Sequence, residues 1–512
     1  MLIHRYLEEN AARFPYKDAA IHLGGRLNYL DLEAAANRLA NQLLKLNVLP
    51  GDRVGILIES SINYIIAYFA ILKAGGIVVG LNSQGTARDF RNILGDCAVT
   101  GLIVGKNAVP VIKEIYHDIP SLRFVISEDH TEHIPKDIAG IDFVDIQLTG
   151  NPARPHVVRQ ENDPAQIIYT SGTTGRPKGV TLSHKNLHAN TSSIIRYLDL
   201  NAEDRVMAIL PFYYSYGNSL LLTHMAVGGS VVIDGRFAYP NVILEIMAQE
   251  RVTGFSGVPS TFAILMHKSN IRNYRFEHLR YITQAGGPMT PALTQKIMEA
   301  LPHIKIFIMY GQTEASARLS YLEPDRLLEK IGSIGKAIPG VELTIKDENG
   351  EICPPGKVGE IVAKGDNIML GYWNNPEESA RVLKPDGLHT GDLAKSDEEG
   401  YLYIVSRSSE MIKSGAHRIS PKEIEEVIAE FPGVIESAVV GVPDEILGEA
   451  IVAYIVGKGE IDQKELRKHL RANLAPFKMP REIYQVDALP KTESGKTKKY
   501  ELVEKYKTKA RA

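Results

Sequence analysis

The sequence has very few of the residues that define several protein classes. It contains two cysteines and one tryptophan in 512 residues. Two cysteines cannot make a disulfide framework or a zinc site by themselves, and they fit a reducing compartment such as the cytoplasm. Lys and Arg (58) nearly balance Asp and Glu (61), which leaves a net charge of −3. Because nucleic-acid-binding proteins usually carry a basic excess, nucleic acid is not expected as a partner.

Long apolar segments are also absent. The longest apolar run, residues 64–72, is far shorter than the ~20 residues that span a bilayer. The N-terminal segment carries charged residues early and lacks the apolar core of a signal peptide. The overall composition, 44% hydrophobic and 23% charged, is typical of a globular protein long enough for about three domains.

The first part of the chain alternates predicted helices with short strands. Apolar periodicity and turn residues predict these elements in order: helix 30–46, strand 53–57, helix 61–73, strand 77–79, strand 230–234, helix 291–301 and strand 306–310. Repeated strand–helix–strand units predict parallel, doubly wound sheets covered on both faces.

The residue composition and the predicted elements change in the later part of the chain. Glycines and short β-rich pieces dominate residues 331–405, which predicts a smaller, barrel-like β region. Helices then return: a proline opens a predicted helix at 421–430, and the predicted strands are 439–442, 451–456 and 482–486. We therefore expect an α/β protein with a large N-terminal domain, residues 1–406, and a small α+β C-terminal domain, residues 407–512.

The strongest local motif is YTSGTTGRPKGV, residues 169–180. Its glycines let backbone N–H groups approach phosphate oxygens, its hydroxyls add donors, and Lys178 adds positive charge. Pro177 stands where a Walker A loop would have glycine, so the motif is not a Walker A loop. A phosphate-binding loop of another kind is predicted.

Further motifs follow in a fixed order. They are QAGGP (284–288), YGQTE (310–314), GSIG (332–335), PG (339–340), GYW (371–373), TGD (390–392), YLYIVSR (401–407), GVPD (441–444) and PKTESGK (490–496). Together with residues 169–180 they resemble the adenylate-forming superfamily of acyl- and aryl-CoA synthetases, peptide-synthetase adenylation domains and luciferases. The resemblance extends from about residue 10 to residue 500.

This resemblance implies an ATP site. The implied ATP- or AMP-binding residues are Thr170, Ser171, Gly172, Thr173, Thr174, Lys178, Gly286, Gly287, Pro288, Tyr310, Gly311, Gln312, Asp392, Ile404 and Arg407. Tyr310 is expected to stack on adenine, and Asp392 to accept hydrogen bonds from the ribose hydroxyls. Arg407 closes the large domain and is expected to reach the ribose as well.

The resemblance also implies the catalytic residues. Lys496 is expected to bridge the substrate carboxylate and the α-phosphate, stabilising charge in the transition state. Glu314 is expected to hold Mg²⁺ against the phosphates, and Thr313 to donate to the α-phosphate or to the carboxylate. Without the resemblance, Lys496 would be read as a solvated lysine of a basic tail.

The expected acyl pocket contains two departures from the family pattern. By family position its residues are Tyr214, Asn218, Val258, Gln284, Ala285, Gly286 and Ser316. Tyr214 stands where many relatives have histidine. The same stretch lacks the aspartate that pairs with an α-amino group, so ordinary α-amino acids are disfavoured. An aryl, branched or medium-chain acid fits these residues.

The hinge and the acceptor region depart as well. Ser409, with Glu410 beside it, stands at the expected hinge, where relatives have aspartate or lysine. Gly415, Ala416 and His417 mark the region where the pantetheine thiol would enter, and Ala416 replaces a common glycine. Coenzyme A (CoA) is the expected acceptor. The alternative is the phosphopantetheine arm of a separate acyl carrier protein. Ala416 favours this alternative, and the basic C-terminal tail could bind an acidic carrier.

The sequence thus predicts an ATP- and Mg²⁺-dependent, AMP-forming acid–thiol ligase of the cytoplasm, acting on a small carboxylic acid, with a homodimer as one possible assembly. A luciferase-like oxygenase and an amide synthetase remain alternatives of another class. His184, His224 and the two cysteines, Cys97 and Cys353, are expected to be structural.

Overall fold

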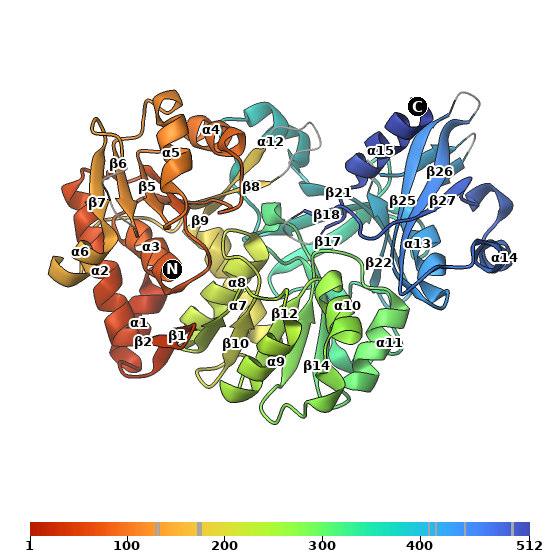
Figure 1. The fold of residues 1–512 in the computed structure, drawn as a ribbon, viewed down its shortest axis with the longest axis horizontal. Coiled ribbons are helices and arrows are strands. Elements are labelled where there is room, and N and C mark those ends of the chain that lie inside the picture. Colours follow the sequence, from red (N-terminus) through yellow and green to blue (C-terminus); the bar gives the residue numbers. More distant parts are fainter. Residues whose placement is uncertain are drawn as a thin grey trace.

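A computed structural model describes residues 1–128, 131, 134–170, 177–407, 410–414, 417–444, 447–492 and 496–511. Over these residues the chain forms two large, mainly parallel sheets, a curled antiparallel sheet and a smaller α+β domain at the C-terminal end (Figure 1). The predicted fold class is confirmed.

The first large sheet has the strand order β19-β9-β8-β4-β3-β5-β6-β7. Its strands are β3 (Arg53–Leu57), β4 (Ile77–Gly80), β5 (Gly101–Val104), β6 (Phe124–Ser127), β7 (Ala139–Asp142), β8 (Pro164–Thr170), β9 (Lys178–Ser183) and β19 (Gly371–Tyr372). Strands β3 to β8 pair in parallel, but β8 and β9 form an antiparallel hairpin. The predicted phosphate loop therefore connects two paired strands.

The second large sheet has the order β16-β15-β14-β13-β12-β10-β11-β1-β2. Its strands are β1 (Asp18–His22), β2 (Gly25–Asn28), β10 (Arg205–Ala208), β11 (Ser230–Ile233), β12 (Gly254–Gly257), β13 (Tyr281–Gln284), β14 (Lys305–Tyr310), β15 (Ser320–Leu322) and β16 (Lys336–Ala337). The central strands are parallel, whereas β2, β15 and β16 at the two edges are antiparallel.

Helices cover both sheets. They are α1 (Arg5–Arg13), α2 (Tyr29–Lys45), α3 (Ile62–Lys73), α4 (Ala87–Asp96), α5 (Val109–Ile115), α6 (Phe143–Thr149), α7 (His184–Leu198), α8 (Ser215–Val227), α9 (Pro240–Gln249), α10 (Pro259–Lys268) and α11 (Pro291–Ala300). The apolar run noted above forms α3, which begins after an N-cap by Ser61 and is buried on nearly all sides. No described helix is both long and apolar enough to cross a membrane.

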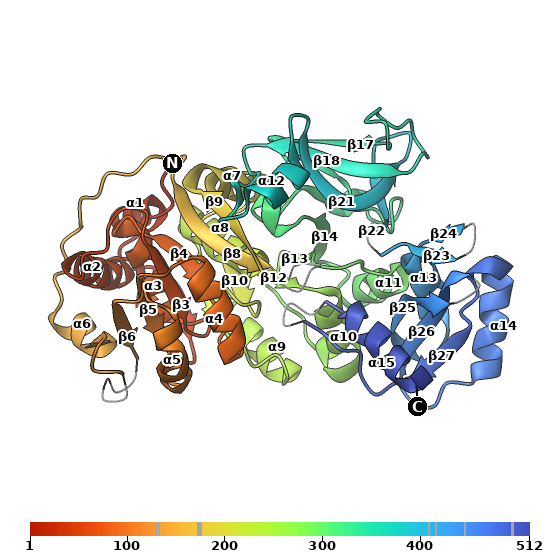
Figure 2. The ribbon, with the colours of Figure 1, turned by 90° about the horizontal axis from the view of Figure 1, so that it is seen from above.

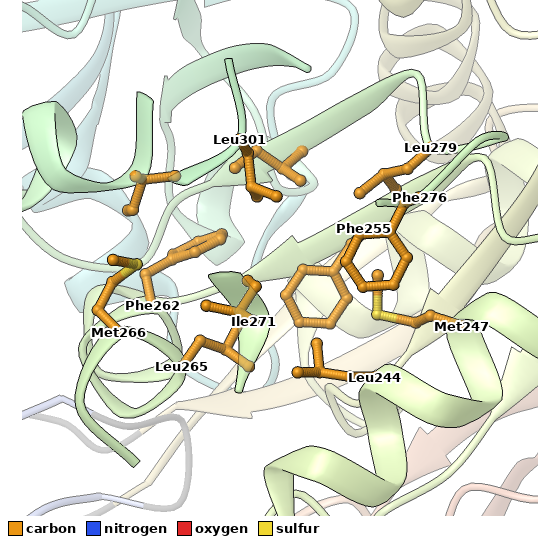
Figure 3. Close-up of a pocket in the computed structure, with 12 residues that line it drawn as sticks. Leu244, Met247, Phe255, Phe262, Leu265, Met266, Ile271, Phe276, Leu279 and Leu301 are labelled. Atoms are coloured by element: carbon orange, nitrogen blue, oxygen red, sulfur yellow. The ribbon is translucent and has the colours of Figure 1, made fainter. Parts of the chain in front are cut away.

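A separate apolar core lies between the second sheet and helices α9 to α11. Phe255 of β12, Phe262 of α10 and Phe276 point toward one another there, around a small cavity (Figure 3). Its volume is about 10 Å³ and its lining is apolar. A space of this size holds at most about one water molecule, and without polar partners it stays dry.

The curled sheet follows, with the order β17-β18-β21-β20 and β22 paired to β21. Its elements are β17 (Val341–Lys346), β18 (Gly359–Gly365), α12 (Pro376–Val382), β20 (Leu383–Lys384), β21 (Gly387–Ser396) and β22 (Leu402–Arg407). Short 3₁₀ turns, η1 (Tyr116–Asp118), η3 (Ile271–Asn273), η4 (Thr313–Ala315), η5 (Pro324–Arg326) and η6 (Pro476–Lys478), occur along the chain.

The C-terminal elements lie at one end of the molecule, opposite helices α1 to α3, in both ribbon views (Figure 1 and Figure 2). They are β23 (Ile412–Ser414), β24 (His417–Ile419), α13 (Pro421–Glu430), β25 (Val434–Asp444), β26 (Gly448–Gly457), α14 (Gln463–Asn473), β27 (Glu482–Gln485) and α15 (Lys499–Arg511). Strands β25 and β26 are longer than predicted, because their antiparallel pairing extends beyond the apolar residues.

Candidate active site

A cleft with a volume of about 440 Å³ opens at the carboxyl ends of strands β13 and β14, facing the C-terminal elements. Ligands bind at this edge in wound sheets. The cleft brings together many residues that the sequence predicted: Gln284, Gly286, Gly287, Pro288, Tyr310, Gly311, Asp392, Ile404, Arg407, Glu410 and Lys496. They come from four parts of the chain far apart in sequence.

Asp392 is the buried anion of this cleft, with 4% of its surface exposed. The Tyr310 hydroxyl donates to one of its carboxylate oxygens (2.7 Å), and Arg407 Nε donates to the other (3.0 Å). Arg407 lies directly opposite Asp392 in the β21–β22 ladder. Burial, together with the Asp392 charge, raises the pKa of Tyr310 well above its ordinary value, so this hydroxyl stays a donor.

Two glycines of the cleft let the backbone run where a side chain would not fit. Gly286 has φ +86°, a left-handed conformation that other residues rarely adopt. A Cβ on Gly311 would lie 2.0 Å from the carbonyl oxygen of Ala317. Gln284 Nε2 donates to the Gly287 carbonyl (2.8 Å), and its buried Oε1 has no partner among the described residues. That oxygen remains available to a donor in the cleft.

Glu314 follows β14 in the short turn η4. Its Oε1 accepts a hydrogen bond from the Tyr372 hydroxyl (2.9 Å). Burial and the neighbouring Glu314 charge raise the pKa of Tyr372, which keeps this hydroxyl protonated. Within the described part of the chain, no three His, Cys, Asp or Glu side chains gather as a metal site. A single carboxylate fits Mg²⁺ that is held mainly by water and nucleotide phosphates.

The phosphate-loop motif is described only at its two ends. Thr170 ends β8 and lies opposite Lys178, which begins β9. Lys178 forms an ion pair with Glu378 of α12. Ser171, Gly172, Thr173 and Thr174 lie outside the described residues, so their predicted phosphate contacts stay a prediction.

Lys496 reaches the same cleft from the C-terminal segment. Its side chain is open to solvent, but the surrounding protein removes part of the hydration of its ammonium. This desolvation, and then the charge of Arg407, lower the pKa of Lys496, while Asp392 and Glu314 act in the opposite direction. The lysine therefore lies within the electrostatic field of the residues predicted to bind ribose and Mg²⁺.

Comparison with known proteins covers both parts of the chain. Residues 7–373 match the family model described as "AMP-binding enzyme", and residues 423–496 match "AMP-binding enzyme C-terminal domain". The chain belongs to the AMP-binding enzyme family. The predicted adenylate-forming superfamily is thereby confirmed.

Individual members of the AMP-binding enzyme family match along nearly the whole chain. A feruloyl-CoA synthase of Amycolatopsis sp. is 32% identical over 495 residues, covering 95% of this chain and 96% of that protein. A long-chain-fatty-acid–CoA ligase of Bacillus subtilis (strain 168) is 31% identical, covering 97% and 93%. The crystal structure of the anthranilate CoA ligase AuaEII with anthranoyl-AMP superimposes with a TM-score of 0.92 at 27% identity, covering 100% and 98%.

Of the residues predicted for the acyl pocket, Gln284 and Gly286 line the cleft, and the others are not among its lining residues. Tyr214 is the N-cap residue of α8, with its ring 4.5 Å from that of Tyr213. Asn218 is buried and donates to Gln166 (2.8 Å). The remaining members are also buried: Val258, Ala285 and Ser316. Ser316 Oγ donates to the Asn367 carbonyl (2.7 Å), which gives it a structural bond.

The structure describes Thr313 but only part of the predicted hinge and acceptor region. The Thr313 hydroxyl lies 3.3 Å from Ser215 Oγ, which connects η4 to the start of α8. Ser409, Gly415 and Ala416 lie outside the described residues, and His417 begins β24. Gln312 Nε2 is buried without a partner among the described residues, next to Thr313.

Sequence reasoning assigned no role to several residues that hold the site together. Glu360 of β18 accepts from Gly391 N (2.9 Å) and faces His389 Nδ1 (2.8 Å), on both sides of Thr390. Asn367 donates to the carbonyls of Ala315 and Arg318, just after Glu314. Their partners are distant in sequence, so no local pattern could have revealed these contacts. Tyr372 did belong to the GYW motif, which was a usable signal.

The histidines and cysteines expected to be structural are buried in the protein. His184 Nδ1 accepts from Ile3 N (3.2 Å), and His224 Nδ1 lies 2.9 Å from the Leu220 carbonyl; both side chains are buried. Cys97 and Cys353 are buried free thiols. Burial raises the pKa of Cys97 to about 12, so it is not a nucleophile near neutral pH.

Proposed function

We propose that this protein is an ATP-dependent, AMP-forming acid–CoA ligase. It would activate a carboxylic acid as an acyl-adenylate, release pyrophosphate, and pass the acyl group to the thiol of CoA. One observation carries the proposal. Lys496 of the C-terminal part and the Asp392–Arg407 pair line one cleft, in a chain that both family models match.

In the first step, ATP binds across the ends of β13 and β14. Tyr310 lies against adenine, and Asp392 accepts from the ribose hydroxyls. Mg²⁺, held by Glu314 and the phosphates, would neutralise part of the phosphate charge. Lys496 donates to the substrate carboxylate and the α-phosphate, which brings the two anions together and stabilises the charge that develops during attack.

In the second step, the C-terminal domain, residues 407–512, rotates about Ser409 and Glu410. Lys496 then leaves, and the segment with Gly415, Ala416 and His417 faces the adenylate. The thiolate attacks the acyl carbonyl, the bond to AMP breaks, and a thioester forms. We propose CoA as the acceptor because both relatives and the solved structure named above are CoA ligases or synthases.

The acid is proposed to be an aryl, branched or medium-chain carboxylic acid. Tyr214 and the small residues Ala285 and Gly286, expected at the acyl pocket, are uncharged, and residues 211–218 contain no aspartate to pair with an α-amino group. We place the enzyme in the cytoplasm, where ATP, CoA and reduced thiols occur together. A homodimer is proposed as its assembly.

The test is a pair of assays on the purified protein. Acid-dependent exchange of pyrophosphate into ATP, measured over a panel of carboxylic acids, is expected for at least one acid of the proposed class. Saturable thioester formation with free CoA is then expected with that acid. Transfer only to a holo-carrier protein would replace CoA by the carrier, and absence of any exchange would reject the proposal.

A further inference from the structure

Lys178 is held by its neighbours at the end of the phosphate loop. Its ammonium pairs with Glu378 Oε2, and the two side chains are only 18% and 21% exposed. The same ammonium lies 5.2 Å from the ring centroid of Tyr372, on β19. Partial burial makes such a pair stronger than an open surface pair, and the ring adds a cation–π attraction. Lys178 is therefore fixed over Tyr372.

Tyr372 connects this pair to Glu314. Its hydroxyl donates to Glu314 Oε1 (2.9 Å), the carboxylate proposed to hold Mg²⁺. A chain of direct contacts thus runs from Glu378 through Lys178 and Tyr372 to Glu314. Each contact restricts the next side chain, so a change at Glu378 reaches the carboxylate.

Glu378 itself is placed by a short, well-anchored helix. Asn375 caps α12 by accepting from the backbone N–H of Glu378 (3.1 Å). Ser379 Oγ accepts from the backbone N–H of Tyr372 (2.8 Å) and donates to the Asn375 carbonyl (2.7 Å). Arg381 pairs with the second carboxylate oxygen of Glu378. The helix and β19 therefore act as one support.

We infer that Glu378 is a positioning residue of the nucleotide site, because it holds Lys178 over Tyr372 and so orients the Glu314 carboxylate for Mg²⁺. In this arrangement the Lys178 charge acts through Tyr372 and Glu314 and does not serve as a free phosphate ligand. The inference rests on the proposed ATP-dependent function and adds a residue to its metal–phosphate site.

The test measures ATP binding by calorimetry, without any acid, in Mg²⁺ and in excess EDTA. Glu378→Gln keeps the shape of the side chain and removes its charge. We expect its Kd for ATP in Mg²⁺ to rise about tenfold. In EDTA, wild type and variant should bind ATP equally, because the effect acts through the metal ligand. Glu377→Gln is the matched control: Glu377 is 83% exposed and pairs with Arg381, so its Kd should stay that of the wild type.

A second variant keeps the test decisive if Glu378→Gln does not fold. Tyr372→Phe removes only the hydroxyl and should weaken Mg²⁺-dependent ATP binding similarly, and the double variant should be no weaker than either single one. Unchanged or tighter ATP binding by Glu378→Gln would overturn the inference, since Lys178 would then be a direct phosphate ligand held back by Glu378. Equal weakening in EDTA would overturn it too. A wild-type protein that binds no ATP would instead reject the proposed function.

Discussion

At the scale of single residues, the cleft is organised by a few charges of opposite sign. Asp392 is buried and takes hydrogen bonds from Tyr310 and Arg407. Lys496 enters the same field, with its pKa lowered by desolvation and by Arg407. A cation with incomplete hydration interacts more strongly with an arriving carboxylate and phosphate than a fully solvated lysine does.

The first prediction concerns Lys496→Ala. We expect acid-dependent pyrophosphate exchange to fall by about 100-fold or more, because the charge bridging carboxylate and α-phosphate is lost. Thioester formation from preformed acyl-adenylate should survive, since Lys496 is not needed in that step. Lys505→Ala, an exposed change on α15, is the control and should leave both half-reactions intact. Unchanged exchange would show that Lys496 has another role.

The second prediction concerns Asp392→Asn. The amide cannot accept as well from the ribose hydroxyls, and it leaves Arg407 without its ion-pair partner. We expect the KM for ATP to rise about 10- to 100-fold, the usual effect of losing a charged hydrogen bond. The KM for the acid, measured in the same exchange assay, should change much less. Equal effects on both constants would mean that Asp392 supports the whole cleft and not the ribose.

At the scale of elements, apolar periodicity predicted the strongly patterned pieces well. Strand β3 and helix α13 have the predicted bounds, and α3 begins just after its cap residue Ser61. The pairing partners were not predictable in the same way. Strand β19 has only two residues and pairs with β9, far away along the chain. Such a short strand has no periodicity of its own, and its pairing depends on the surrounding fold.

The third prediction concerns the contact between the N-terminal segment and α7. Burial lowers the pKa of His184 to about 3 and that of His4 to about 4, from 6.5. Both stay neutral in the folded protein, whereas the unfolded chain takes up protons below about pH 6.5. The free energy of unfolding is therefore full above pH 6.5 and falls as the pH drops, by up to about 1.4 kcal/mol per pH unit for each histidine.

Denaturant titrations at pH 7, 6 and 5 measure this slope. His184→Asn keeps a side-chain acceptor for the Ile3 N–H but does not titrate. Its stability should be lower at pH 7 and should depend less on pH. If the variant loses stability with acid as steeply as the wild type, other groups cause the acid sensitivity.

At the scale of the whole molecule, the site exists only because separate parts of the fold meet. The second large sheet, the curled sheet and the C-terminal elements each contribute residues to the cleft. A contact on β22 joins the C-terminal elements to the rest: Lys422 Nζ donates to the Ile404 carbonyl (2.9 Å). The proposed rotation would have to break contacts of this kind.

The fourth prediction concerns a contact within the C-terminal domain. Lys499, at the start of α15, pairs with Glu425 (2.8 Å) and with Glu410 (3.4 Å), a residue of the proposed hinge. Lys499→Ala should slow adenylation several-fold, because the segment carrying Lys496 loses its tie to the hinge, while transfer from preformed adenylate changes less. Lys499→Arg keeps the charge and should restore the rate of pyrophosphate exchange. Equal slowing of both half-reactions would point to a general loss of stability.

The sequence by itself determined the family, the two-part α/β architecture and the order of the motifs that mark the nucleotide site. It could do so because glycine-rich turns, capped helices and apolar periodicity are local properties, written into neighbouring residues. The boundary at residue 407 remains a prediction from the change in composition along the chain, and the hinge and the acyl pocket remain predictions from the resemblance.

Only the tertiary structure decided which side chains touch. It paired Asp392 with Tyr310 and Arg407, brought Lys496 to them, and connected Lys178 to Glu314 through Glu378 and Tyr372. These contacts join residues that lie far apart along the chain. Their energies depend on burial and on charges supplied by other elements, and no window of sequence contains that information.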